Sequence, residues 1–294
     1  MDAFTAAQTH KPADAGRGRA KGTGGTDCQR ISLREQRRRR TLLRVLAAAL
    51  EKFPGLRLAA ISGGQFDNVI CSRCDAVVAL PTGSGAAFTA FIREFDAALK
   101  NEYAVTDPGV TLTCAAAKAA KAVPAERTAT LVQALAAMPQ GVEAMDTDFP
   151  GLVQTSLNMG VVKLDGDGLH ITFSIRSSIA SRKLMLAQRV RAVAALAGGT
   201  VAERGVYPGW QYKRESKFRD TLLAAYKDLT GKDGVVEATH GGLECGLLME
   251  KIPGLDAVSM GPELHDVHSV RERLNVPSTE RTYELVCELL RRSC

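Results

Sequence analysis

Apolar positions in the first two thirds of the chain switch repeatedly between helical and extended spacing. After Thr41, apolar residues recur every three or four positions as far as Phe53, just before Pro54 and Gly55, and this spacing predicts an amphipathic helix. Further on we expect strands over 56–62, 76–80, 110–115, 155–163, 169–175 and 199–204, and helices ending near 103 and over 125–138 and 181–197. This order predicts an α+β domain over 41–204, with helices on one face of a mostly antiparallel sheet.

The last part of the chain, 205–294, alternates differently. A boundary is expected where Gly205 and the run Tyr207-Pro208-Gly209-Trp210 interrupt the pattern. Beyond it we expect helices over 216–230 and 278–292, and a short helix between two strands at 235–238 and 257–260. Strands that alternate with helices are typical of a parallel sheet covered by helices, so the overall fold class is α/β. Because two parallel strands alone leave an open edge, we expect 205–294 to be the C-terminal portion of a larger α/β domain.

The first 40 residues differ from the rest in composition and charge. They hold ten Lys and Arg and four Asp and Glu side chains, a surplus of six that equals the net charge of +6 of the whole chain. Because they contain few large apolar residues, we expect residues 1–40 to form a disordered basic tail. The remaining chain is neutral and has no basic surplus for phosphates, so we expect no nucleic-acid partner. A nucleic-acid arm or a targeting peptide is the alternative for the tail.

Hydropathy and cysteine content limit the class of protein further. No apolar run approaches the roughly 20 residues that span a bilayer, and the first residues lack the apolar segment of a secretory signal. We therefore expect no membrane partner and a cytoplasmic location. The seven cysteines are odd in number and scattered, unlike a secreted disulfide framework. Cys71 and Cys74 form one C-x-x-C pair, which we interpret as reduced thiols because no second pair accompanies it.

The stretch 239–269 concentrates the candidate chemistry. Three of the chain's five histidines, together with Glu244, occupy expected loop positions close to glycines and short β-prone runs. His268 follows a Gly-Pro turn and suits a metal ligand or a catalytic base. His240 precedes two glycines that would let a substrate approach the backbone, and Glu244 could bind a substrate. Each residue alone also has a plainer explanation: a surface histidine, a glycine-rich turn, or a carboxylate at a helix start.

Several ordered motifs point to one family when they are taken together. They stand at 62–70 (SGGQFDNVI), 174–178 (SIRSS), 207–210 (YPGW), 240–246 (HGGLECG), 252–262 (IPGLDAVSMGP) and 268–269 (HS). In this order they resemble the motifs of the aminoacyl-histidine dipeptidases, also called peptidase D or cytosol non-specific dipeptidases, which are carnosinase-like dinuclear zinc metallopeptidases. The resemblance covers about residues 41–294. It implies a lid and dimerisation domain over 41–204, followed by the C-terminal portion of the catalytic domain over 205–294.

The resemblance implies roles for particular residues of this sequence. His268 matches a ligand of one of the family's two zinc ions. The family's substrate-binding positions are matched by Asn68, Arg176, His240, Gly242 and Glu244. Asn68 and Arg176 are expected to contact the carboxylate end of the substrate, a task that suits a planar guanidinium. The family forms homodimers through its lid and cleaves dipeptides such as Xaa-His with a zinc-bound water that a glutamate deprotonates.

The chain departs from the family at positions that matter for catalysis. It has no counterpart of the general-base glutamate or of the other metal ligands, so no catalytic residue is assigned. The lid histidine is also absent, since Thr26 follows Gly24-Gly25 near its place, and Cys71 replaces a proline. We therefore expect a truncated dipeptidase of doubtful activity, with residues 1–40 as an unrelated lead-in. The alternative is a catalytically silent dimerisation or binding module.

Overall fold

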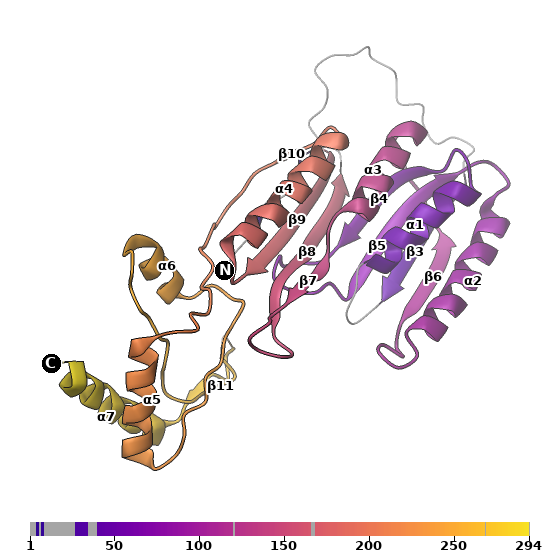
Figure 1. Cartoon of the computed structure of the whole chain (residues 1–294). Helices are drawn as coiled ribbons and strands as arrows, with labels where there is room; N and C mark the ends of the chain where they lie inside the picture. Colours follow the sequence, from indigo (N-terminus) through magenta and orange to yellow (C-terminus); the bar gives the residue numbers. More distant parts are fainter. Residues whose placement is uncertain are drawn as a thin grey trace.

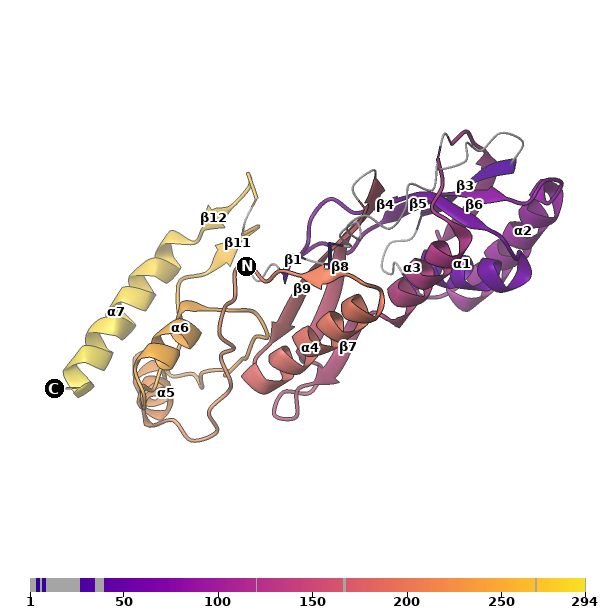
Figure 2. The same cartoon turned by 90° about the horizontal axis from the view of Figure 1, so that it is seen from above.

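An antiparallel sheet covered by helices on one face forms the larger part of the molecule (Figures 1 and 2). The computed structural model describes residues 4–5, 7–8, 27–34, 40–119, 121–165, 168–267 and 269–293. The eight-stranded sheet has the order β1-β9-β8-β4-β5-β3-β6, with β7 paired to β8. Its strands are β1 (Phe4–Thr5), β3 (Asp27–Arg34), β4 (Arg57–Gly63), β5 (Arg73–Leu80), β6 (Thr111–Ala116), β7 (Gly141–Met145), β8 (Val153–Asp165) and β9 (Gly168–Ser177).

Helices cover the sheet on the side that carries its buried apolar residues. They are α1 (Arg40–Lys52), α2 (Gly85–Glu102), α3 (Ala125–Ala137) and α4 (Ala180–Leu196). A small second ladder joins β2 (Ala7–Gln8) to β10 (Thr200–Val201) beside α4. The predicted fold class, α/β, is confirmed, and so are the helices expected over 41–53, 125–138 and 181–197 and the hairpin of 155–175.

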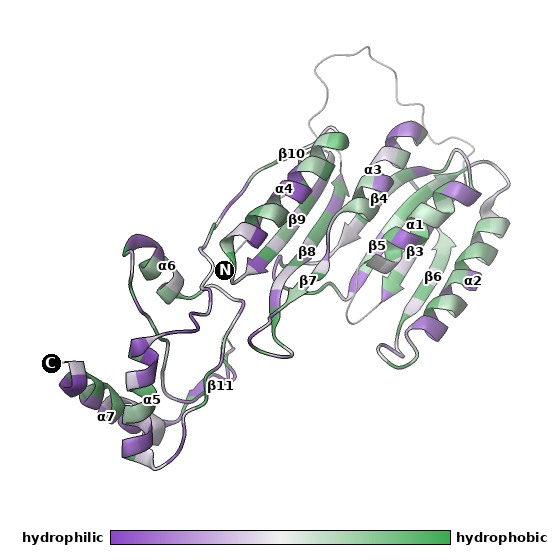
Figure 3. Ribbon diagram, in the orientation of Figure 1, coloured by the Kyte–Doolittle hydropathy of each residue, from purple (hydrophilic) through white to green (hydrophobic). Residues whose placement is uncertain are grey.

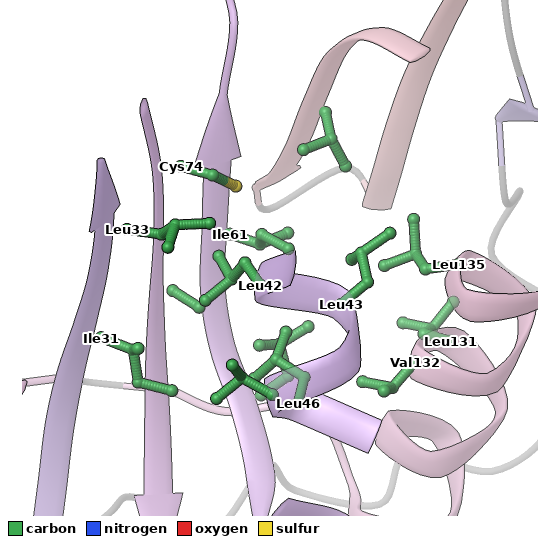
Figure 4. Close-up of a cluster of buried hydrophobic side chains, with 14 of the residues drawn as sticks. Ile31, Leu33, Leu42, Leu43, Leu46, Ile61, Cys74, Leu131, Val132 and Leu135 are labelled. Carbon is green, nitrogen blue, oxygen red and sulfur yellow. The ribbon is translucent and has the colours of Figure 1, made fainter. Parts of the chain in front are cut away.

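Helix α1 shows how the sequence pattern builds this core. Its apolar residues cover two sides of the helix, and Figure 4 shows both sides in contact with neighbours. Leu42 and Leu46 lie toward Ile31 and the sheet, whereas Leu43 lies toward Leu135 of α3. All five side chains are buried. Each such burial stabilises the fold by about 1.5–3 kcal/mol, so α1 fixes α3 as well as the sheet.

Strand β3 corrects the expectation of disorder in the first 40 residues. It pairs with β5 from Asp27↔Leu80 to Arg34↔Arg73 and with β6 on its other side, so it is an interior strand. Cys28, Ile31 and Leu33 are buried, while arginines of the same strand are exposed. The arginine-rich composition of this segment predicted disorder, although its buried side chains form the apolar face of a strand. The other residues of the expected tail lie outside the described ranges, apart from 4–5 and 7–8 in their short strands and Arg40 at the start of α1.

The C-terminal part contains helices without the expected parallel sheet. Its elements are α5 (Lys217–Thr230), α6 (Glu244–Lys251), β11 (Leu264–His265), β12 (Arg273–Leu274) and α7 (Val276–Ser293). The predicted helices over 216–230 and 278–292 are confirmed. The predicted strands at 235–238 and 257–260 are wrong, because among the described residues neither segment forms a backbone hydrogen bond to a partner strand. A β-prone run becomes a strand only where a ladder satisfies its peptide groups. The strand expected over 199–204 is likewise reduced to β10.

Candidate functional site

Asn68 lies on a loop between β4 and β5 that is fastened to strand β8. The side-chain amide of Asn158 donates hydrogen bonds to the carbonyls on both sides of Asn68, at 2.7 Å to Asp67 O and 3.1 Å to Val69 O. Gly160 follows at an irregularity of the β8–β9 ladder, and a Cβ there would lie 2.1 Å from Asp67 Cα. The close approach therefore requires glycine. Asn68 itself is exposed on a loop held at its backbone.

Arg176 lies on the face of the sheet that the helices leave open. Its neighbour Ile175 is fully buried in the helix-covered core, and successive strand residues point to opposite faces. Arg176 pairs with Ser156, and Asn158 pairs with Ser174. Asn158 is two positions from Ser156, roughly 7 Å along the strand, so it shares a face with Arg176. The loop of Asn68 and the guanidinium therefore stand on the same open face.

His240, from the C-terminal part of the chain, lies within electrostatic range of Arg176. The imidazole is half-buried in the loop before α6. Burial lowers the pKa of His240 below its usual range, and the nearby positive charge of Arg176 lowers that pKa further. The structure thus favours a neutral imidazole beside a permanently charged guanidinium. Such a pair can present several hydrogen-bond donors to one anionic group.

Two glycines allow close packing on the two sides of the run 207–210. At Gly242 a Cβ would lie 2.4 Å from Cδ1 of Tyr207, so the loop packs on this aromatic ring. At Gly209 a Cβ would lie 2.6 Å from the carbonyl oxygen of Ser178, just after β9. Lys183 Nζ donates a hydrogen bond to the carbonyl of Tyr207. The run 207–210 therefore packs between the end of β9 and the His240 loop.

Glu244 and Asn68 are less tightly connected to this arrangement. Glu244 opens helix α6 and is exposed, a position where a carboxylate interacts favourably with the helix dipole. Within the described ranges, no hydrogen bond or ion pair joins Asn68 to Arg176 or His240. The structure thus unites Arg176, His240 and Gly242, with Glu244 two residues further on. Asn68 shares only the face of the sheet.

The chain is similar to known peptidases over most of its length. Residues 30–107 match the family model described as the peptidase dimerisation domain of the M20 peptidases. The chain is 32% identical over 251 residues to the cytosol non-specific dipeptidase of Escherichia coli (strain K12), covering 85% of this chain and 52% of that protein. The crystal structure of aminoacylhistidine dipeptidase from Vibrio alginolyticus matches 99% of this chain and 60% of its own, with 25% identity and a TM-score of 0.83. The predicted resemblance to the aminoacyl-histidine dipeptidases is confirmed. The chain spans about half the length of its curated dipeptidase relative.

The donor set of the described residues does not fit the dinuclear zinc centre implied by the dipeptidase resemblance. His268, the expected metal ligand, lies outside the described residues. Among the residues that are described, no group of three or more His, Cys, Asp or Glu side chains could hold a metal ion. His265 instead contacts Glu263, with Nε2 3.1 Å from Oε1. A dinuclear centre needs several ligands with supporting contacts, which this set does not provide.

Sequence reasoning missed the residues that hold the site together. Gly160 had a signal, because a glycine inside a strand pattern often marks a bulge or a close backbone approach. Asn158 and Lys183 had none, since their hydrogen bonds join segments far apart in sequence. In the described part of the chain, no helix has the length and hydrophobicity required to cross a membrane.

Proposed function

We propose that Arg176 and His240 bind the carboxylate end of a dipeptide, and that the chain serves the hydrolysis of dipeptides, including Xaa-His. The observation that carries this proposal is that the His240 loop packs on Tyr207, in the run seated against the end of β9, within electrostatic range of Arg176. A guanidinium forms paired hydrogen bonds with a carboxylate, and an adjacent neutral imidazole can donate one more. The similarity to dipeptidases supports a peptide ligand.

The remaining matched residues have supporting roles in this proposal. Gly242 keeps the loop free of a side chain, so that a substrate can approach its backbone. Glu244 offers a carboxylate at the start of α6, and Asn68 offers an amide from the loop seated on β8. The site then lies at the junction of two domains. We place the first over 27–204 and the second over 205–294.

Metal binding and assembly belong to the same proposal. We propose zinc as the metal, with His268 as the ligand that this chain contributes, and with hydrolysis dependent on ligands beyond the described residues. A homodimer is proposed through the domain that includes residues 30–107, supported by the match to a peptidase dimerisation domain. A cytoplasmic location is proposed because the curated relative is named a cytosol dipeptidase.

Calorimetric titration with Gly-His tests the binding proposal. The variant Arg176→Met should bind Gly-His roughly 10- to 100-fold more weakly, because a hydrogen-bonded charged contact contributes about 1.5–3 kcal/mol. Arg182→Met is the matched control, because Arg182 is exposed on α4, and it should bind as the unaltered protein does. Equal affinity of the unaltered protein and Arg176→Met would contradict the proposal.

A catalytically silent dimerisation or binding module is the second candidate. It is favoured by the lack of a metal-ligand cluster among the described residues. Elemental analysis for zinc, together with hydrolysis of β-Ala-His and Gly-His in added zinc or manganese, separates the two. Turnover with stoichiometric metal identifies a dipeptidase. A protein that binds dipeptide, holds no metal and gives no turnover is a silent module.

A further inference from the structure

We propose that Lys183 is a positioning residue, which holds the His240 loop against Arg176 by fixing the backbone of Tyr207. The inference rests on the proposed function, because it concerns the same dipeptide site. Lys183 would touch no substrate. It would act through two intermediaries, the carbonyl and the ring of Tyr207.

The first step is the hydrogen bond from Lys183 to Tyr207. Lys183 lies in the first turn of α4, and only 7% of it is exposed. A buried ammonium has lost its hydration, so its hydrogen bonds must be made inside the protein. One of them goes to the carbonyl oxygen of Tyr207. This bond joins the sheet domain to the run 207–210 at the point where the chain leaves that domain.

The second step runs from the ring of Tyr207 to the His240 loop. A Cβ at Gly242 would approach Cδ1 of the ring to 2.4 Å and Cε1 to 2.9 Å, so the loop lies flush against the ring. Gly242 is two residues after His240. A displacement of Tyr207 therefore moves the loop directly, because no side chain lies between them to absorb it.

The same run is fitted closely on its other side. A Cβ at Gly209 would lie 2.6 Å from the carbonyl oxygen of Ser178 and 2.8 Å from that of Ser177. Both serines are buried at the end of β9, next to Arg176. Gly246 of α6 likewise approaches the carbonyl of Pro208, where a Cβ would stand at 3.3 Å. The run 207–210 therefore links the strand of Arg176 to the loop of His240.

Other contacts keep the two domains attached without Lys183. Nε of Arg214 lies 2.9 Å from Oδ1 of Asp148. The rings of Phe149 and Tyr212 form an edge-to-face pair with centroids 4.8 Å apart. Loss of the Lys183 hydrogen bond should therefore shift the His240 loop while the domains stay joined. A shift of the His240 loop without separation of the domains distinguishes a positioning role of Lys183 from a merely structural one.

Nuclear magnetic resonance titration of the ¹⁵N-labelled histidine side chains tests the proposal on the full chain. The resonance of His240 is assigned from its absence in His240→Gln. In the unaltered protein His240 should titrate below the ordinary histidine pKa of about 6.5. In Lys183→Met, which keeps most of the side-chain volume and removes the donor, the midpoint should rise toward that value. Lys163→Met, an exposed lysine on β8, is the matched control and should titrate as the unaltered protein does.

An unchanged His240 midpoint in folded Lys183→Met would overturn the proposal, as would an unshifted midpoint in the unaltered protein. If Lys183→Met does not fold, Tyr207→Ala replaces it, since this variant removes the ring and retains the hydrogen-bonded carbonyl. Its midpoint should also rise, and an unchanged one would be equally contradictory. Tyr207→Phe keeps the ring and should leave the midpoint in place.

Titration of the same proteins with Gly-His distinguishes failure of this inference from failure of the proposed function. The positioning role predicts weaker Gly-His binding by Lys183→Met and unchanged binding by Lys163→Met. If the unaltered protein binds no dipeptide, the proposed function fails whatever the histidine titration shows. If it binds, and Lys183→Met binds equally with an unchanged His240 midpoint, only the positioning role fails.

Discussion

The sheet region, residues 27–201, and the C-terminal region, residues 205–293, bury apolar side chains to very different extents. In the sheet region, strands and helices together enclose one continuous core that includes Phe88, Phe173 and Ile31 at 0% exposure. The buried cluster of the C-terminal region consists of Leu222, Ala225 and Leu289. Figure 3 shows apolar residues in both regions, so the difference does not come from hydropathy alone.

The difference lies in whether the extended segments have partners. In the sheet region every strand lies in a ladder, and the helices seal its apolar face. In the C-terminal region α5 and α7 flank a groove of about 720 Å³, which the unpaired segments 235–237 and 258–260 help to line. An extended apolar segment can join a closed core only where its backbone groups are hydrogen-bonded, and in the sheet region the ladders provide those bonds.

Hydrogen exchange should give the largest contrast between the regions. Amides of β3 are hydrogen-bonded inside the sheet and should exchange only on global unfolding. In the described part of the chain, amides of 235–238 and 257–260 donate no backbone hydrogen bond. Relative to an unfolded chain, they should exchange at least about a thousandfold faster than the amides of β3. Mass spectrometry of peptic peptides measures both. Comparable protection in the two regions would mean that the C-terminal segments are paired in solution.

Matched leucine truncations should give the next largest contrast. Leu46→Ala empties part of the closed core and should lower the free energy of unfolding by about 4 kcal/mol. Leu222→Ala should cost about 2 kcal/mol, because its smaller cluster can relax around the lost volume. Urea unfolding followed by circular dichroism and by fluorescence of Trp210, the single tryptophan, reports on both regions. Equal losses for the two variants would remove the distinction between the cores.

A glycine pair gives a smaller and more local contrast. Gly160→Ala would put Cβ 2.1 Å from Asp67 Cα, so strand and loop must separate at a cost of about 1–3 kcal/mol. Gly261→Ala is the control in the C-terminal region, because no atom of the described residues lies within 4 Å of its Cβ position, and it should change stability by less than about 0.5 kcal/mol. Thermal unfolding compares them. A neutral Gly160→Ala would show that the Asn68 loop is not seated on β8.

The smallest expected effect is the dependence of stability on pH that comes from His240. Its folded-state pKa lies below the unfolded value, so the folded protein favours the neutral form. That contribution is complete above the unfolded pKa of about 6.5 and is lost as the pH falls through and below it. Relative to His240→Gln, the unaltered protein should therefore lose stability between pH 8 and pH 5. Parallel stability profiles would contradict the burial of His240 beside Arg176.

The sequence was most informative where local pattern and final environment agree. The helical spacing of Leu42, Leu43 and Leu46 predicted α1, and alternating residues predicted the β8–β9 hairpin. Strand β3 was not predicted from the sequence, because arginines dominate the composition around its buried Ile31. The strands at 235–238 and 257–260 were predicted wrongly, because propensity carries no information about ladder partners.

For the candidate site, resemblance supplied residue identities and the structure supplied their arrangement. Arg176, His240 and Gly242 came from matched motifs, but their proximity depends on packing between segments that are distant in sequence. Asn158 and Lys183 could not be found from sequence, because their hydrogen bonds to Asp67, Val69 and Tyr207 join segments that are far apart in the chain. The role expected of His268 stays a prediction.

The central claim is that Arg176 and His240 receive a carboxylate, and a comparison of Gly-His with its C-terminal amide tests it most directly. The two ligands differ only at the C-terminal group, where a neutral amide replaces the carboxylate that the guanidinium would bind. We predict that the unaltered protein binds the free acid at least about tenfold more tightly than the amide, and that Arg176→Met erases this preference. Equal affinity of the unaltered protein for acid and amide, measured by calorimetry, would contradict the claim.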